Sequence, residues 1–167
     1  MGYKLVQPSW TFCAAHEDNQ MRVYYAHCIA IYNTPQEQRD IEALENLGFD
    51  VVNPNNPDID QRCAHIRKEW STLHLPGTGE LRDKYGPYDD AGHAIMEIIF
   101  RPLVSASKCD GVVFRGLPDG RIPAGVLKEL DWARECGLPI LELPSNFTGR
   151  SMTVDHTREY LREIGAR

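Results

Sequence analysis

The sequence of 167 residues lacks the features that assign a chain to membrane, secreted or disulfide-rich proteins. It has no apolar run approaching the ~20 residues that a membrane-spanning helix needs, and no signal peptide is visible. Its five cysteines are scattered, odd in number and never spaced as C-x-x-C, which favours reduced thiols. We therefore expect a soluble protein of the cytoplasm.

Several motifs for nucleotide, hydrolytic and metal chemistry are also missing. The chain has no P-loop, no dinucleotide-binding G-x-G-x-x-G and no G-x-S-x-G nucleophile elbow. The closest approach to a metal site is Cys63-Ala-His65, but Cys63 fits the buried stripe of its own helix. We therefore expect no metal and no cofactor. The net charge of −6 and the absence of long Lys/Arg clusters make a nucleic-acid polymer an unexpected partner.

What the sequence does contain is an alternation of short apolar runs and amphipathic segments. Strands are expected over 21–26, 50–53, 111–115 and 139–143, and helices from Pro35, after Asp58, over 91–107, from Pro123 and over 154–164. Thr34-Pro35-Gln36-Glu37 is a capping box at the start of the first helix, whose predicted buried face contains Ile41, Leu44 and Leu47, and Asp58 is the predicted cap of the second. Strands that alternate with helices are typical of a parallel sheet with right-handed crossovers. We predict an α/β fold: a single doubly wound domain of flavodoxin or Rossmann type, with four to five mainly parallel strands.

Two segments stand outside this alternation. Residues 1–20 have no clear period, and we expect an N-terminal arm or added edge strand ahead of a domain that spans 21–167. Residues 71–90 are rich in Pro and Gly and have no apolar period. A loop of about twenty residues in a compact domain is usually functional or disordered, so a mobile lid and an oligomer contact are both open interpretations.

One carboxylate, Glu129, occupies a position where the helical pattern expects an apolar residue. At about 100° per residue, Glu129 falls within the apolar arc that Val126, Leu130 and Ala133 define. In a parallel α/β unit the start of this helix borders the rim where ligands bind. A poorly hydrated carboxylate there suits a nucleophile or general base, with its pKa raised by burial and lowered by the helix N-terminus. The alternatives are a structural glutamate with hydrogen-bond partners, or a helix register displaced by one residue.

The carboxyl ends of the other predicted strands supply further candidate binding residues. Tyr24 and His27 end the first strand, and each is either a ligand-binding residue or an ordinary core or loop residue. Asn53 follows the second strand, where turn chemistry explains it equally well. Arg115 follows the third strand. The backbone amides of Ala124 and Gly125 then begin a helix, and a helix N-terminus suits a phosphate.

Two more acids are candidates for protonating a leaving group. Asp119 lies in the loop before the Glu129 helix, close to Arg121. Glu97 lies on the preceding helix, where its i+4 neighbour Arg101 offers a plain surface salt bridge instead.

The spacing Gly125-x-x-x-Glu129-x-x-x-Ala133-x-x-x-Gly137-x-Pro139 and the opening strand Arg22-Val-Tyr-Tyr-Ala-His27 resemble the nucleoside 2-deoxyribosyltransferase superfamily, including the deoxynucleoside monophosphate N-glycosidases. The resemblance covers roughly residues 21–143. It implies that Glu129 attacks the anomeric carbon of a sugar and that Tyr24 is the site tyrosine. It also implies that Glu97 can belong to the site, as an acid of the preceding helix does in some relatives. Relatives form dimers or larger assemblies whose subunits complete each other's pockets.

We therefore expect cleavage or transfer of the N-glycosidic bond of a (deoxy)nucleoside or its 5′-monophosphate, in a homodimer or higher homo-oligomer. Trp70, Tyr85, Tyr88, Ile98 and Phe100 are the apolar residues expected to support self-association. The alternative is a non-catalytic protein that captures a nucleotide-derived ligand. It stays open because His27 and Asp131 differ from the residues usual in the family.

Overall fold

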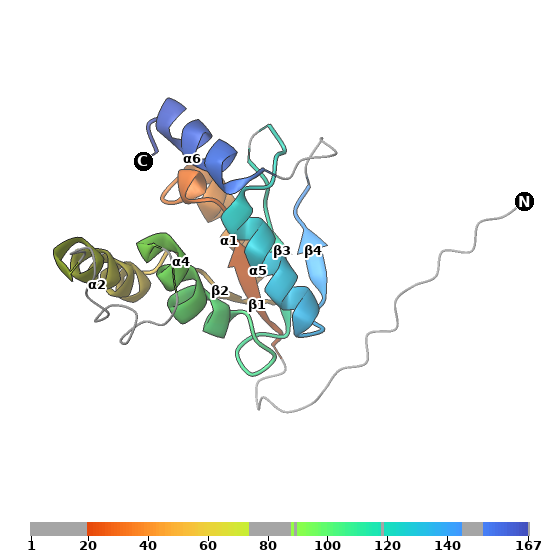
Figure 1. Cartoon of the computed structure of the whole chain (residues 1–167). Coiled ribbons are helices and arrows are strands. Elements are labelled where there is room, and N and C mark those ends of the chain that lie inside the picture. Colours follow the sequence, from red (N-terminus) through yellow and green to blue (C-terminus); the bar gives the residue numbers. More distant parts are fainter. Residues whose placement is uncertain (1–19, 74–87, 89, 118, 145–151, 167) are drawn as a thin grey trace, which may run out of the picture.

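The computed structural model describes residues 20–73, 88, 90–117, 119–144 and 152–166, and its centre is a parallel sheet (Figure 1). The strands are β1 (Arg22–Ala26), β2 (Asp50–Val52), β3 (Gly111–Phe114) and β4 (Ile140–Glu142). They pair in the order β2-β1-β3-β4, and every pair is parallel. The predicted α/β fold is confirmed. The strand order reverses between β1 and β3, which is where open α/β sheets bind ligands.

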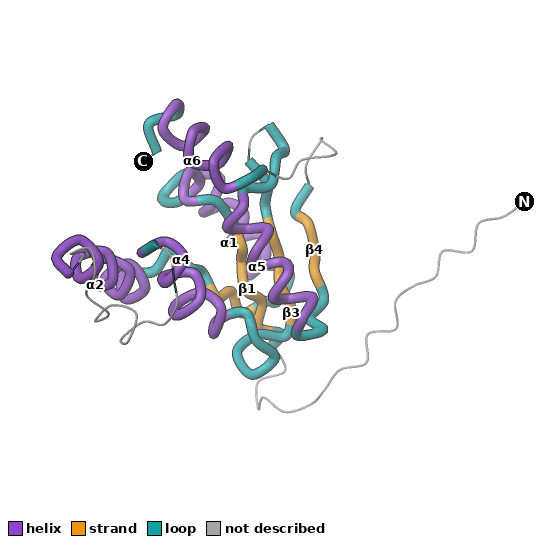
Figure 2. The backbone as a smooth tube through the Cα atoms, in the orientation of Figure 1, coloured by secondary structure: helices purple, strands orange, loops and turns teal. Residues whose placement is uncertain are grey.

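Helices cover both faces of this sheet, as Figure 2 shows, so the domain is doubly wound as predicted. Neighbouring residues of a strand point to opposite faces. Tyr24 accordingly packs in the cluster that contains Val126 and Leu130 of α5 (Ala124–Glu135). Tyr25 packs in the opposite cluster, which contains Leu44 of α1 (Pro35–Asn46). The alternation along β1 therefore sends its two tyrosines to different sides of the sheet.

The start of α1 follows the predicted chemistry. The Thr34 hydroxyl oxygen accepts a hydrogen bond from the backbone N–H of Glu37 at 3.3 Å, and Pro35 opens the helix. The end of the helix differs from the prediction. Leu47, which we placed on the buried face, is 72% exposed because it is the C-cap residue and lies beyond the last turn of the packed stripe.

A second helical layer lies beside β2 and contains α2 (Pro57–Leu73) and α4 (Ala91–Ile95). The predicted stripe of α2 is confirmed, since Cys63 and Ile66 pack against α4 in one buried cluster. The prediction that Asp58 caps α2 is wrong. The side-chain oxygen of Asn56 accepts from the backbone N–H of Asp58 at 2.9 Å, so Asn56 is the cap and the helix begins at Pro57, two residues earlier than predicted.

The helix predicted over 91–107 is shorter and less regular than expected. After α4 the chain continues as a π-helix, η2 (Met96–Phe100), and a 3₁₀ turn, η3 (Arg101–Leu103). Pro102 has no N–H to continue the ladder, so the helix ends there instead of at residue 107. Ile98 and Phe100, which we had assigned to an oligomer contact, pack against the protein's own α2–α4 cluster.

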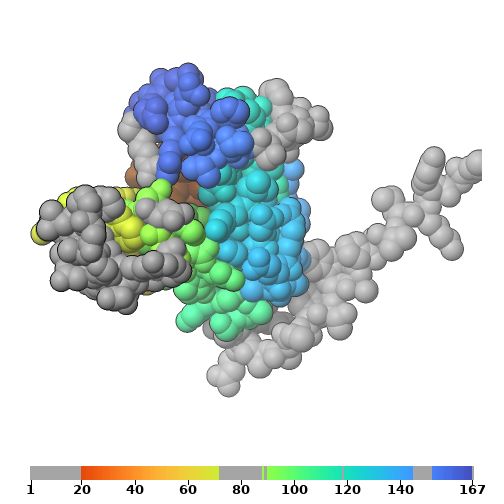
Figure 3. All heavy atoms as spheres, in the orientation of Figure 1, coloured from red at the N-terminus to blue at the C-terminus, as the bar shows by residue number. Residues whose placement is uncertain are grey.

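The C-terminal helix α6 (Val154–Glu163) confirms its predicted position in the sequence and covers one end of the molecule, at the top of Figure 3. That end is the one at which α5 begins (Figure 1). The predictions for residues 1–20 and for the loop over 71–90 fall almost entirely outside the described residues. Within the described part of the chain, no helix has the length and apolar character needed to cross a membrane.

Candidate active site

The structure brings Glu129 and Tyr24 into direct contact. Glu129 lies in the second turn of α5 and is only 5% exposed, as its place in the apolar arc predicted. The Tyr24 hydroxyl donates a hydrogen bond to Glu129 Oε1 at 2.8 Å, across 105 positions of sequence. The other carboxyl oxygen, Oε2, is buried and has no hydrogen-bond partner among the described residues. One oxygen is thus fixed, and the other is available to a bound molecule.

Burial controls the ionisation of this pair. Loss of hydration raises the pKa of Glu129 to about 8, while the Tyr24 hydrogen bond acts in the opposite direction. Burial and the nearby Glu129 charge together raise the pKa of Tyr24 well above its usual value. At neutral pH the resting site therefore holds mainly a neutral carboxylic acid. It becomes a poorly hydrated carboxylate only when its proton is removed.

A second hydroxyl group, that of Tyr32, lies near the same carboxyl. Tyr32 follows the 3₁₀ turn η1 (Ile29–Ile31) at the carboxyl end of β1. Burial raises the pKa of Tyr32, and the negative charge of Glu129 raises it further. The two side chains are therefore close enough to interact electrostatically. The Tyr32 ring lies 4.8 Å from the ring of His27, centroid to centroid. Tyr32 was not among the residues predicted from the sequence.

His27 itself is held inside the protein. Its Nδ1 lies 2.9 Å from the backbone oxygen of Tyr25, and its Nε2 lies 3.0 Å from Glu37 Oε1. Its ring also stacks on that of Tyr25 at 4.1 Å. Burial lowers the pKa of His27, whereas the hydrogen bonds to Tyr25 and Glu37 raise it. With both ring nitrogens engaged, His27 supports the end of β1 and does not present a nitrogen to a ligand.

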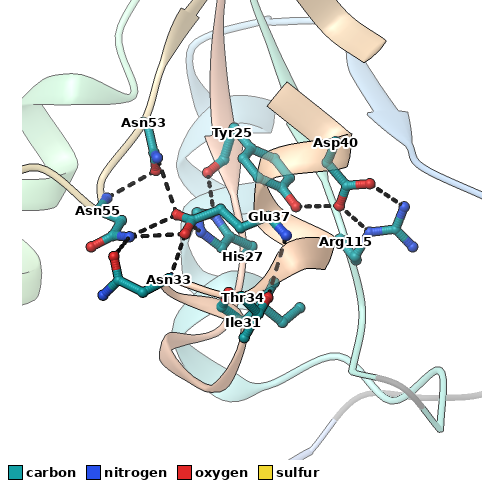
Figure 4. A network of polar contacts seen from close by, with 10 residues as sticks. All are labelled: Tyr25, His27, Ile31, Asn33, Thr34, Glu37, Asp40, Asn53, Asn55 and Arg115. Atoms are coloured by element: carbon teal, nitrogen blue, oxygen red, sulfur yellow. Dashed lines mark hydrogen bonds and ion pairs between the residues drawn. The ribbon is translucent and has the colours of Figure 1, made fainter. Parts of the chain in front are cut away.

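Glu37 is the centre of a polar network that the sequence analysis did not predict (Figure 4). Its carboxylate accepts hydrogen bonds from the side-chain amides of Asn53 at 3.0 Å and Asn55 at 2.9 Å, and from the backbone N–H of Asn33 at 2.5 Å. Burial opposes ionisation, but these donors outweigh it and lower the pKa of Glu37. Asn53, a predicted binding residue, thus joins the end of β2 to α1.

Arg115 lies on the α1 side of the sheet. It forms a two-pronged ion pair with Asp40, with Nη2 at 2.6 Å from Oδ1 and a second, shorter contact from Nε to Oδ2. The Tyr25 hydroxyl donates to the same carboxylate at 2.5 Å. The Asp40 carboxylate of α1 thus engages Arg115 on the side of the sheet opposite to Glu129 of α5.

The two predicted acids are each paired with cations. Asp119 Oδ2 accepts from Arg121 Nε at 2.7 Å, and this bond is the main reason that the pKa of Asp119 is lowered. Glu97 forms ion pairs at 2.9 Å with Lys128 and with Arg101. Partial burial opposes ionisation of Glu97, but these two cations outweigh it and lower its pKa. Both groups are held ionised, which is the wrong state for donating a proton at neutral pH.

The N-terminus of α5 is partly occupied by the protein itself. The backbone N–H of Ala124 donates to the Thr157 hydroxyl of α6 at 3.1 Å. Gly125 faces open space, since a Cβ at that position would meet nothing within 4 Å. Pro123 is the N-cap residue and not the first helical residue that we predicted.

Within the described residues, no group of three or more metal-binding side chains gathers at one point. Cys63 is buried in the α2–α4 cluster, while His65 lies 3.4 Å from Glu69 on the same helix. Among the described residues, the polar side chains near the carboxyl end of β1 are therefore mainly tyrosines, asparagines and carboxylates.

Comparison with known proteins adds no relative: no family model matches the chain, and neither the curated proteins nor the solved structures contain a match. The functional interpretation consequently depends on the residues and geometry described above.

Proposed function

We propose that the protein cleaves or transfers the N-glycosidic bond of a (deoxy)nucleoside or its 5′-monophosphate, with Glu129 as nucleophile. The supporting observation is the buried Glu129 carboxyl, which is fixed through Oε1 by Tyr24 at 2.8 Å and leaves Oε2 unpartnered in the described structure. A neutral hydroxyl that holds one oxygen of a carboxylate orients the other toward an electrophile without neutralising its charge.

The proposed reaction begins with loss of the Glu129 proton. Oε2 then forms a bond to the anomeric carbon while the bond from that carbon to the base nitrogen breaks. The electron pair of the broken bond stays on the base, which takes up one proton. The resting carboxyl carries a proton at neutral pH, because its pKa is about 8, so this proton is first lost to solvent, and the base takes up its proton from water. Water or a second base then attacks the glycosyl ester, which regenerates Glu129.

The direct test is release of free base, measured by chromatography, from a panel of nucleosides and 5′-monophosphates. Glu129→Gln keeps the size of the side chain and its acceptor for Tyr24 but removes the nucleophile, so base release is expected to fall by at least about 10³-fold. Glu135→Gln, an exposed glutamate of the same helix, is the matched control and should retain full turnover. If Glu129→Gln kept most of its activity, the nucleophile assignment would be wrong.

A second candidate function is capture of a nucleotide-derived ligand without chemistry. The observation that favours it is the resting charge state, since a neutral Glu129 can donate a hydrogen bond as well as accept one. Isothermal titration with the same panel separates the two functions. A pure binding protein binds a ligand tightly and releases no base from it over hours.

We also propose a cytoplasmic location and a homo-oligomer. Four cysteines in the described residues are unbridged, which supports a reducing compartment. The oligomer proposal now depends on the family resemblance, because Ile98 and Phe100 pack within the protein's own core. Light scattering at micromolar concentration tests it, and a 19 kDa particle with full activity would refute it.

A further inference from the structure

Helix α6 packs against the carboxyl edge of the sheet and not against either of its faces. Its buried residue Leu161 shares a cluster with Cys28, Leu117 and Met152, none of which belongs to a strand. Cys28 follows β1 and Leu117 follows β3, the two strands between which the strand order reverses. In open α/β sheets the crevice at that point receives the ligand. In this structure Leu161 packs against residues that closely follow both of these strands.

The same helix occupies a hydrogen-bonding position at the start of α5. The hydroxyl oxygen of Thr157 accepts from the Ala124 N–H at 3.1 Å, and Thr157 in turn donates to the backbone oxygen of Thr153 at 2.8 Å. A ligand oxygen at a helix N-terminus would use this same N–H. Figure 1 shows α6 above the first turn of α5, five residues before Glu129.

The remaining attachments of α6 are mostly exposed. Arg158 pairs with Asp90 at 2.9 Å, and both side chains are nearly half exposed. Arg121 lies over the Tyr160 ring at 4.9 Å. The Met152 N–H donates to the Ile122 oxygen at 2.8 Å just before the helix. Exposed ion pairs add little stability, so the burial of Leu161 is the principal contact that keeps α6 in place.

We propose that α6 is a displaceable cap: it covers this edge of the sheet in the resting protein and lifts as a unit to let a ligand reach Glu129. The inference rests on the proposed function for the identity of that ligand. The lifting itself is tested without any ligand, so the failure of one can be distinguished from the failure of the other.

Three equally buried thiols make the test specific. Cys28 lies under α6, whereas Cys63 and Cys109 lie in two other clusters and are exposed only when those clusters open. The native full-length protein is treated with iodoacetamide, and the labelling rate of each cysteine is read by peptide mass spectrometry. We expect Cys28 to react faster than the other two. Local opening exposes only the groups beneath the moving element.

Leu161→Ala weakens the principal contact and should raise the Cys28 rate by roughly 30-fold or more, with Cys63 and Cys109 unchanged. Ile164→Ala, at a residue 46% exposed near the end of the same helix, is the matched control and should leave all three rates unchanged. The cap is refuted if the three thiols label at one common rate, or if Leu161→Ala leaves the Cys28 rate unchanged.

Turnover provides the second measurement. The substrate is the nucleoside or monophosphate that the wild-type protein cleaves fastest. If α6 limits access, Leu161→Ala raises kcat/KM, while Ile164→Ala does not change it. A selective rise in Cys28 labelling accompanied by a fall in kcat/KM would mean that α6 is a fixed wall of the pocket, and the displaceable cap would be rejected. If no compound in the panel is cleaved, the proposed function fails. The labelling result alone then tests whether α6 is displaceable.

Discussion

The raised pKa of Glu129 predicts a specific dependence of protein stability on pH. In the unfolded chain this carboxyl ionises with its ordinary pKa of 4.5, whereas in the folded protein its pKa is about 8. Between these values the folded state binds one proton that the unfolded state has lost. The free energy of unfolding therefore decreases as pH rises, by about 1.4 kcal/mol per pH unit from this group alone. The stabilising effect is complete below pH 4.5 and is lost as the pH rises through 8.

Glu129→Gln removes this dependence and leaves a neutral side chain of the same shape. The stability difference between the variant and the wild type isolates Glu129, because every other group contributes equally to both proteins. From pH 5 to pH 7.5 the wild type should lose about 3 kcal/mol relative to the variant. Near pH 5 the two should have similar stability, since both then carry a neutral group beside Tyr24.

Urea unfolding at half-unit steps of pH, followed by tryptophan fluorescence, measures this difference directly. Glu135→Gln changes an exposed glutamate of the same helix and should give a constant difference across the range. Parallel curves for the wild type and Glu129→Gln would refute the reasoning, because they would show that Glu129 ionises in the folded protein as it does in water.

Local periodicity in the sequence determines where both Glu129 and Tyr24 lie. The helical period placed Glu129 in an apolar arc, and the two-residue period of β1 separated Tyr24 from Tyr25. Together these rules direct Tyr24 and Glu129 to the same space between the sheet and α5.

The helical period that identified Glu129 as a buried acid also identifies the buried acids of α1. Glu37 and Asp40 each lie four positions before an apolar residue, Ile41 and Leu44 respectively, on the face of the helix that we assigned to the core. A charged residue on the apolar face of a helix predicts a buried polar contact, and this holds for Glu37 and Asp40 as it does for Glu129. The partners of these acids were harder to predict, since Arg115 meets Asp40 across 75 positions of sequence. No local period connects two such segments.

The contacts of α6 also could not be predicted from the sequence. Whether a C-terminal helix covers a sheet face or its edge depends on the packing of the whole domain. The sequence predicted a phosphate at the N-terminus of α5. In the structure Thr157, 33 positions away, accepts the hydrogen bond of the Ala124 N–H instead. The Asp119–Arg121 pair, in contrast, spans two residues and was within reach of the sequence.

Three further predictions concern the residues around the site. Asp40→Asn leaves Arg115 half-buried without its carboxylate and should lower the free energy of unfolding by about 3 kcal/mol in urea, with base release per folded molecule unchanged. Glu37→Gln removes an acceptor that several donors share, and should cost roughly 2–4 kcal/mol at pH 7. Because the pKa of Glu37 is lowered by folding, this cost should shrink as the pH falls below 4.5; a cost that does not vary with pH would contradict the assignment. Tyr24→Phe removes the only hydrogen bond to Glu129 in the described structure, and it tests the nucleophile through the pH profile of turnover. The Tyr24 hydrogen bond stabilises the ionised form of Glu129, and a hydrogen bond to a charged group contributes roughly 1.5–3 kcal/mol. Its loss should therefore raise the pKa of Glu129 by about one to two pH units. A nucleophile must be ionised, so kcat/KM of the wild type should rise with pH and level off above about 8. In Tyr24→Phe the rise should move to higher pH by the same amount, which lowers kcat/KM roughly 10- to 100-fold at pH 7 and much less at pH 10. Tyr25→Phe makes the same chemical change on the opposite face of the sheet, where the hydroxyl contacts Asp40, and should leave the position of the rise unchanged. A profile that falls with increasing pH would identify Glu129 as a proton donor and not a nucleophile, and a uniform loss at every pH would show that Tyr24 acts by packing alone.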